Sequence, residues 1–109
     1  MENSSIVPSF EGKEIRKVWH GEQWYFSIID VIEFLTESPS PIKYWVKLKS
    51  IEFKTSPFWE QLKMTTKDGK SGFTECANTE GVFRVLKCIP SPKAEQFKRW
   101  LVEMKEQSA

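Results

Sequence analysis

Pro90-Ser91-Pro92-Lys93-Ala94-Glu95 separates two segments whose apolar residues recur at helical spacing. Proline cannot continue the helix before it, because it has no backbone N–H and its ring clashes with the preceding turn. Serine followed by proline favours the start of a new helix. The stretch therefore predicts a sharp corner between two helices, and Lys93, Lys98 and Arg99 give the second helix a basic face.

The same serine–proline signal recurs upstream at Ser40-Pro41 and predicts another helix start. The apolar stripe expected for that helix consists of Ile42, Trp45, Val46 and Leu48. Lys43 and Lys47 are four residues apart and therefore share a face, which Lys54 would extend if the helix continued that far.

Two more helices are indicated by apolar residues at the same spacing. Ser27 is expected to cap the first, with Asp30 as its capping-box partner and with an apolar stripe of Ile28, Val31, Ile32 and Leu35. Thr79 is expected to cap the other, whose stripe is Val82, Val85, Leu86 and Ile89. In the helix after the corner, the residues expected to point inward are Ala94, Phe97, Leu101 and Met104.

Extended segments pair into two predicted β-hairpins. The first joins the run around Ile15–Trp19 to Trp24–Phe26 through His20-Gly21-Glu22, where glycine is available for a positive φ. The second joins an alternating run from Gln61 to a short run around Phe73 and Thr74 through Lys67-Asp68-Gly69-Lys70. A tight turn at Glu11-Gly12-Lys13 would let Phe10 begin a third short strand.

Strands and helices are therefore segregated in the order ββαα-ββαα, which predicts an α+β fold with antiparallel hairpins and four helices. A chain of 109 residues supports one compact domain, and its 14% aromatic content suits an ordered core. We expect a flexible leader over residues 1–9, the domain itself over 10–104, and a frayed tail over 105–109.

The composition favours a cytoplasmic protein without a membrane span. The N-terminus lacks the basic start and apolar core of a secretory signal, and no apolar run approaches the ~20 residues that cross a bilayer. Cys76 and Cys88 match no metal-binding spacing, and they are best explained as small apolar side chains in a reducing compartment.

No constellation of residues predicts catalysis or a cofactor. The one histidine, His20, is placed on a turn, and no nucleophile is positioned for it. One His and two Cys in unrelated positions do not make a zinc site, and no glycine-rich phosphate loop follows a strand. The sequence therefore predicts no enzyme activity, no metal and no cofactor.

Basic residues favour binding of a polyanion. Residues 1–37 carry three basic and seven acidic residues, whereas residues 38–109 carry thirteen basic and eight acidic ones. Lys43 and Lys47 interleave with Tyr44 and Trp45, a pattern that suits phosphate contacts beside an aromatic. Trp45 is expected in the core, and a solvated helix face accounts for the lysines as well. A second basic set is Arg84, Lys87, Lys93, Lys98 and Arg99.

Three blocks of the chain carry recognisable motifs. Residues 24–35, WYFSIIDVIEFL, contain an aromatic pair followed by x-x-D-V-x-x-x-L, with FEGKEIR at residues 10–16 before them. Residues 78–86 contain x-E-G-hydrophobic-x-R-hydrophobic, and residues 92–101 contain P-x-A-x-x-F-x-x-W. In this order and spacing, the blocks resemble the BRO family N-terminal domain. PSPIKYW at residues 39–45 is similar to the N-P-x-K-Y-W stretch of prophage antirepressors and DNA-damage-inducible protein D-like members.

The resemblance implies a DNA-binding domain of viral, phage or prophage transcription regulators. Ile42 departs from the pattern, because relatives often carry a basic residue there. We therefore expect a non-catalytic domain that binds DNA, duplex rather than single-stranded. The residues expected to contact DNA are Lys43, Tyr44, Lys47, Arg84, Lys93, Lys98 and Arg99.

The alternative is a protein-interaction module that binds a repressor or a DNA-repair protein. Its contact surface would be an exposed apolar patch around Phe53, Phe58 and Trp59 in the proline-containing connector, although these aromatics could equally cover the second hairpin. Self-association into a homodimer would use the same surface. A magnesium-dependent nuclease is the most distant alternative.

Overall fold

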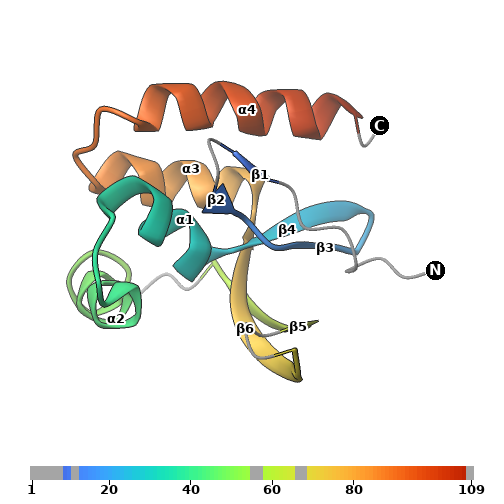
Figure 1. Cartoon of the computed structure of the whole chain (residues 1–109), viewed down its shortest axis with the longest axis horizontal. Helices are drawn as coiled ribbons and strands as arrows, with labels where there is room; N and C mark the ends of the chain where they lie inside the picture. The colour runs from blue at the N-terminus through green and yellow to red at the C-terminus, as the bar shows by residue number, and fades with distance from the viewer. Residues whose placement is uncertain (1–8, 11–12, 55–57, 66–68, 108–109) are drawn as a thin grey trace.

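The computed structural model describes residues 9–10, 13–54, 58–65 and 69–107 (Figure 1). Its elements, in chain order, are β1 (Ser9–Phe10), β2 (Lys13–Glu14), β3 (Lys17–His20), β4 (Gln23–Ser27), α1 (Ile28–Thr36), α2 (Pro41–Glu52), β5 (Glu60–Thr65), β6 (Ser71–Asn78), α3 (Thr79–Cys88) and α4 (Ala94–Gln107). The α+β class and the ββαα-ββαα order are confirmed. Phe10 lies in β1, which pairs with β2 as a separate small sheet.

Several predicted features lie outside the described residues. They are the leader as far as residue 8, the Glu11-Gly12 turn, Pro57 of the connector, the tip of the second hairpin at residues 66–68, and residues 108–109. Helix α4 continues to Gln107, three residues beyond the predicted domain boundary.

The main sheet is antiparallel, with strand order β3-β4-β6-β5. In the first hairpin, Gly21 and Glu22 both adopt positive φ, as the two-residue connection requires. β6 is a central strand of eight residues, longer than the short run expected around Phe73, because it pairs with β4 as well as with β5. The sheet curls, and His20 Nε2 at the end of β3 lies 3.5 Å from Glu60 Oε1 at the start of β5.

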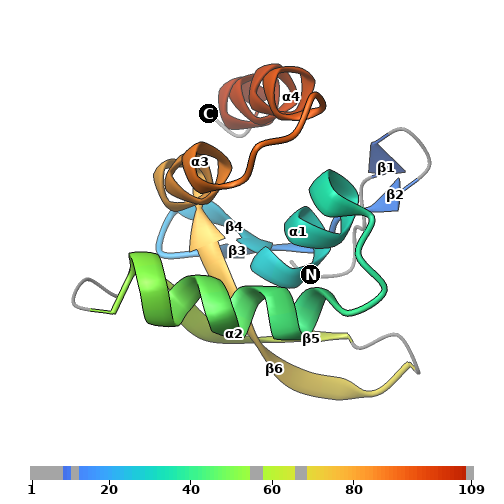
Figure 2. The same ribbon diagram turned by 90° about the vertical axis from the view of Figure 1, so that its left-hand side faces the viewer.

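Each face of the sheet packs against a core over part of its length. One face, at Phe26 and Ala77, joins the main core under the four helices. The opposite face encloses a smaller core of Tyr25, Met64 and Cys76 inside the curl. Figures 1 and 2 show α3 between α4 on one side and α2 on the other.

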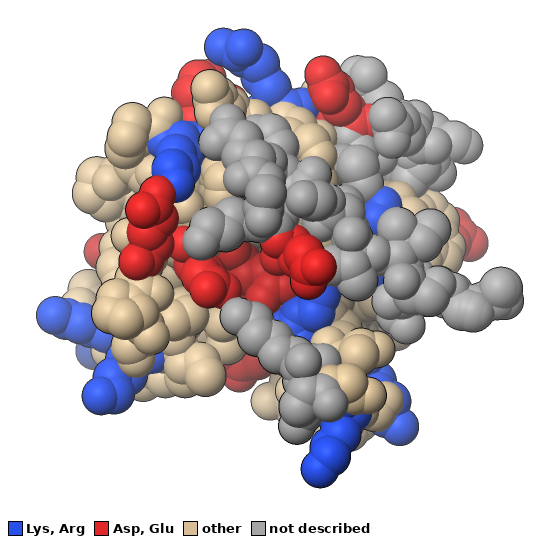
Figure 3. All heavy atoms as spheres, viewed as in Figure 1, with Lys and Arg blue, Asp and Glu red and all other residues tan. Residues whose placement is uncertain are grey.

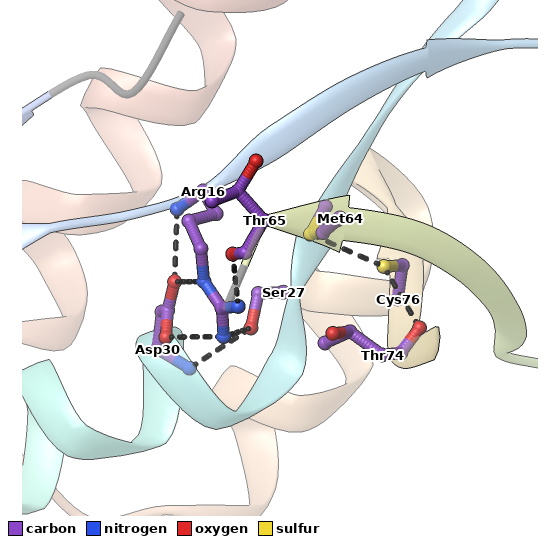
Figure 4. A network of polar contacts seen from close by, with 7 residues as sticks. All are labelled: Arg16, Ser27, Asp30, Met64, Thr65, Thr74 and Cys76. Carbon is purple, nitrogen blue, oxygen red and sulfur yellow. Dashed lines mark hydrogen bonds and ion pairs between the residues drawn. The ribbon is translucent and has the colours of Figure 1, made fainter. Parts of the chain in front are cut away.

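The start of α1 differs from the predicted capping box. The Ser27 hydroxyl accepts a hydrogen bond from the Asp30 N–H at 3.3 Å, as expected, but the Asp30 carboxylate binds Arg16 instead of returning to Ser27. Asp30 Oδ2 accepts from Arg16 Nε at 2.8 Å and from the Arg16 backbone N–H at 2.9 Å (Figure 4). The guanidinium also donates to the Ser27 hydroxyl and to the Thr65 carbonyl.

This network connects four segments of the chain, from the residues before β3 to the end of β5. The hydrogen-bonded carboxylate of Asp30 raises the pKa of Arg16 against the opposing effect of burial. The pattern of the sequence did not predict the pair, because Arg16 and Asp30 meet only when the hairpin folds over α1.

The corner before α4 forms as predicted, but the helix begins at Ala94 and not at the serine–proline pair. The Ser91 hydroxyl donates to the Leu35 carbonyl at 2.9 Å and accepts from the Lys93 N–H at 3.2 Å. It therefore fixes the corner to the end of α1. Phe97 and Leu101 are fully buried, as expected.

Asn78, not Thr79, caps α3, because its side-chain oxygen accepts from the Gly81 N–H at 2.9 Å. Thr79 is the first helical residue. Gly81 is buried where the helix meets the connector, and an added Cβ would lie 2.8 Å from Phe58 Cδ1 and 2.9 Å from Ala77 Cβ. Glycine therefore allows a close approach at this point.

The predicted apolar stripe of α2 is wrong in part. Trp45 is buried and Leu48 packs against the core, but Ile42 and Val46 are 61% and 55% exposed. The helix turns Trp45, Leu48 and Lys49 toward the body of the protein, so Ile42 and Val46 fall on its outer side.

Candidate nucleic-acid interface

Helix α2 is held on the sheet by Glu75, which lies on β6. Trp45 Nε1 donates to Glu75 Oε1 at 2.5 Å, and Lys49 Nζ lies 2.9 Å from the same oxygen. The Trp45 ring also packs against Phe53 and Trp59, with ring centroids 6.2 and 5.3 Å away. These contacts fix the rotation of α2 about its own axis, and they determine which side chains face outward.

The Glu75 carboxylate is stabilised in its charged form. Burial alone would raise its pKa, but the hydrogen bonds from Lys49 and Trp45 outweigh burial, and the pKa lies below its usual value. Lys49 therefore forms a structural ion pair with Glu75 and does not belong with the exposed Lys43 and Lys47.

Lys43 and Lys47 are exposed on the outer side of α2, as predicted. Neither forms an ion pair with another residue in the described ranges. Tyr44 is half-buried and packs against the core, and it shares a shallow hollow with Lys47, Leu48, Ile51 and Glu52. The three residues predicted on this helix therefore lie side by side.

The second basic set is divided among different surroundings. The Arg84 guanidinium lies 4.7 Å from the ring centroid of Phe58 and 5.8 Å from that of Phe53. Lys93 forms an ion pair with Glu37, and its Nζ also donates to the Phe34 carbonyl at 3.4 Å.

Lys98 and Arg99 are exposed on α4, and Lys98 reaches over the Phe83 ring with Lys87 nearby. Because α3 separates α4 from α2, these two residues belong to a different part of the surface from Lys43 and Lys47 (Figure 2).

Charge is also divided over the face in Figure 3. Acidic side chains gather in the centre, whereas basic side chains lie over α2 at the lower left, over α4 at the top and near the tip of the β5–β6 hairpin at the bottom. Most basic groups on this face therefore lie apart from one another around its edge, and others border the acidic centre.

A groove of about 520 Å³ lies between α2 and the sheet. Its walls include Ile42 and Val46 from α2 and Phe73 from β6, and Phe73 is 71% exposed. Lys63 pairs in register with Phe73, so the two side chains project from the same face of the hairpin. This surface was not predicted, because Ile42 and Val46 were expected in the apolar stripe that faces the core.

The aromatics proposed for a protein-binding patch are packed instead. Phe53 is buried, and Phe58 and Trp59 are half-buried against the main core. Phe58 makes edge-on contacts with both Phe53 and Trp59, at centroid distances of 4.8 and 5.2 Å. They cover the main core between α2 and α3, rather than the second hairpin that they were expected to cover.

The described histidine and cysteine side chains do not form a catalytic or metal-binding group. His20 is exposed at the end of β3 beside Glu60. Cys76 is buried, and burial raises its pKa to about 12, while Cys88 is a half-buried free thiol whose pKa burial also raises. No group of three or more His, Cys, Asp or Glu in the described part of the chain could hold a metal ion.

No helix within the described segments is long and apolar enough to cross a membrane. A family model described as BRO family, N-terminal domain, matches residues 14–106. No curated protein and no solved structure matches the chain.

Proposed function

We propose that this chain, which belongs to the BRO family N-terminal domain, is a non-catalytic DNA-binding domain of an antirepressor-like phage or prophage regulator. Domains of this family are generally DNA-binding domains of phage-type regulatory proteins. In this proposal the domain acts on duplex DNA in the cytoplasm.

The observation that carries the proposal is the outer side of α2. Two lysines one turn apart project from a helix whose orientation is fixed by Trp45, Lys49 and Glu75. The one acid of α2 is Glu52 at its last residue, so the cations at Lys43 and Lys47 remain available to phosphates. Lysines that neutralise phosphates release counterions, which makes binding strongly dependent on salt.

Tyr44 suits the border of such a contact, because its ring is anchored in the core and its hydroxyl can reach a phosphate or sugar. Lys98 and Arg99 on α4 and Arg84 on α3 would extend the contact only to DNA that reaches past α3. Lys93 would contribute least, since Glu37 already balances its charge.

A mobility-shift titration tests the proposal, with random duplex and random single-stranded DNA at two ionic strengths. We expect the duplex to be retained at low salt and binding to weaken steeply as salt is added. Lys43→Glu combined with Lys47→Glu should abolish retention with nearly unchanged thermal unfolding, because both side chains are exposed.

The matched variant Lys98→Glu with Arg99→Glu makes the same change of charge on α4. Its retention shows whether the second basic set takes part. If the Lys43→Glu, Lys47→Glu variant retains DNA as strongly as the wild-type protein, α2 is not part of the DNA site. Cleavage of plasmid DNA in the presence of magnesium would contradict the non-catalytic assignment.

The alternative partner, a repressor or DNA-repair protein, would have to use a surface other than the packed connector aromatics. A domain of that kind would retain no DNA at either ionic strength. The titration therefore separates the two functions.

A further inference from the structure

We propose that the groove between α2 and β6 forms the base-contacting part of the DNA site, and that Ile42, Val46 and Phe73 contact thymine methyl groups. The inference rests on the proposed function, and it adds which feature of the duplex is recognised.

Three of the five exposed large hydrophobic residues in the described part of the chain line this groove. Ile42, Val46 and Phe73 come from two elements, are each more than half exposed, and line one concavity. Single exposed apolar residues are ordinary, but several that converge on a groove mark a site of contact.

The floor of the groove is electrically balanced. The acids that line it are Asp30 and Glu75, and each is paired, Asp30 with Arg16 and Glu75 with Lys49. A polyanion approaching the groove therefore meets no uncompensated carboxylate from these two residues.

Exposed lysines neighbour the apolar residues that line the groove. Lys43 and Lys47 each follow directly after a groove residue on α2, and Lys63 stands opposite Phe73 on the hairpin. Apolar walls between cations are complementary to a duplex, whose phosphates flank the base edges on both sides. They are not complementary to a neutral protein surface, which would leave these lysines without partners.

Duplex DNA offers one apolar group at its base edges, the C5 methyl of thymine in the major groove. The major groove is about 12 Å wide and accepts a helix of about 10–12 Å diameter. α2 presents branched aliphatic side chains beside lysines, so its outer side can place methyl contacts and phosphate contacts in one groove. No Arg or Asn on the described surface of α2 competes for a base edge, since its exposed residues are Ile42, Lys43, Val46, Lys47, Ser50, Ile51 and Glu52.

Replacing thymine by deoxyuridine tests the inference, because it removes the methyl and leaves base pairing intact. Fluorescence anisotropy would compare an alternating A·T duplex with the same duplex built with deoxyuridine, at one fixed salt concentration. We expect the thymine duplex to bind about four- to fifteenfold more tightly, as one or two buried methyl groups would give.

Two variants separate the methyl contacts from the phosphate contacts. Ile42→Ala with Val46→Ala should lower the ratio of the two affinities toward one, because Phe73 then remains as the one methyl contact. Lys43→Gln with Lys47→Gln should weaken binding to both duplexes, keep the ratio, and reduce the slope of log affinity against log salt by about two.

The outcomes also distinguish a failure of the methyl contact from a failure of the proposed DNA-binding function. Lysine-dependent binding that does not distinguish thymine from deoxyuridine overturns the methyl contact and leaves the DNA-binding function standing. Failure to bind either duplex overturns both. If Ile42→Ala with Val46→Ala keeps the ratio of affinities but converts a dimer to a monomer in sedimentation, the groove is a self-association surface and the inference is wrong.

Discussion

Replacing Arg16 by methionine should be among the most destabilising single changes in this domain. Methionine keeps much of the stem but removes four side-chain hydrogen bonds, two to Asp30 and one each to Ser27 and Thr65. Asp30, only 4% exposed, would keep the hydrogen bond from the backbone N–H of residue 16 and lose its counter-charge. Breaking a buried pair costs about 3–5 kcal/mol, and we expect the lower end of that range because the Arg16 side chain is partly exposed.

That loss is a large part of the roughly 5–15 kcal/mol by which a domain is usually stable. Urea unfolding followed by tryptophan fluorescence measures it. With an m-value of about 1–3 kcal/mol/M, the midpoint should fall by at least about 1 M. Arg99→Met is the matched control, because Arg99 is exposed on α4 and its loss should change the free energy of unfolding by less than about 0.5 kcal/mol.

The buried charge, not the lost packing, should account for the effect. Adding Asp30→Asn to the Arg16→Met protein removes the unpaired carboxylate and keeps an oxygen for the backbone N–H. We therefore expect the double variant to regain about 1–2 kcal/mol. If Asp30→Asn instead destabilises the Arg16→Met protein further, the network does not act through its charge.

Three further predictions concern residues that position the site or the core. Folding lowers the pKa of Glu75, so the ion pair stabilises the protein above the unfolded pKa of about 4.3, and this stabilisation is lost as the pH falls through the folded pKa. Glu75→Gln should therefore destabilise the protein at pH 7 and progressively less toward pH 3, whereas a loss of stability that does not change with pH would exclude the ion pair as its cause. Gly81→Ala should destabilise by about 1–3 kcal/mol despite alanine's better helix propensity, because its Cβ would collide with Phe58 and Ala77, and an unchanged melting temperature would show that the contact relaxes freely. Iodoacetamide at pH 8 should modify Cys88 in the native protein and reach Cys76 only on unfolding, because Cys76 is buried and its pKa is raised to about 12; equal native rates would mean that β6 opens readily.

Local signals were enough to predict the fold class. Proline and serine at the corners, glycine at the first hairpin and apolar residues at period 3.6 each act over a few residues, so they are visible in the sequence. The errors arise where contacts with other parts of the chain determine which residue caps a helix or which side of a helix faces the core. Asn78 caps α3 although Thr79 is also a capping residue, because β6 extends to residue 78 and brings the Asn78 side chain to the helix end.

The same limit explains what the sequence could and could not say about the site. The periodicity of α2 allows more than one inward direction, because its apolar residues Ile42, Trp45, Val46 and Leu48 are spread over a wide arc of the helix. The direction is chosen by Glu75, thirty residues from Trp45 along the chain, which binds the Trp45 indole and Lys49 on the same side of the helix. That choice turns Ile42 and Val46 outward together with Lys43 and Lys47. A resemblance to a DNA-binding family predicts the lysines, but only the partner on β6 predicts that branched aliphatic side chains stand beside them at the surface.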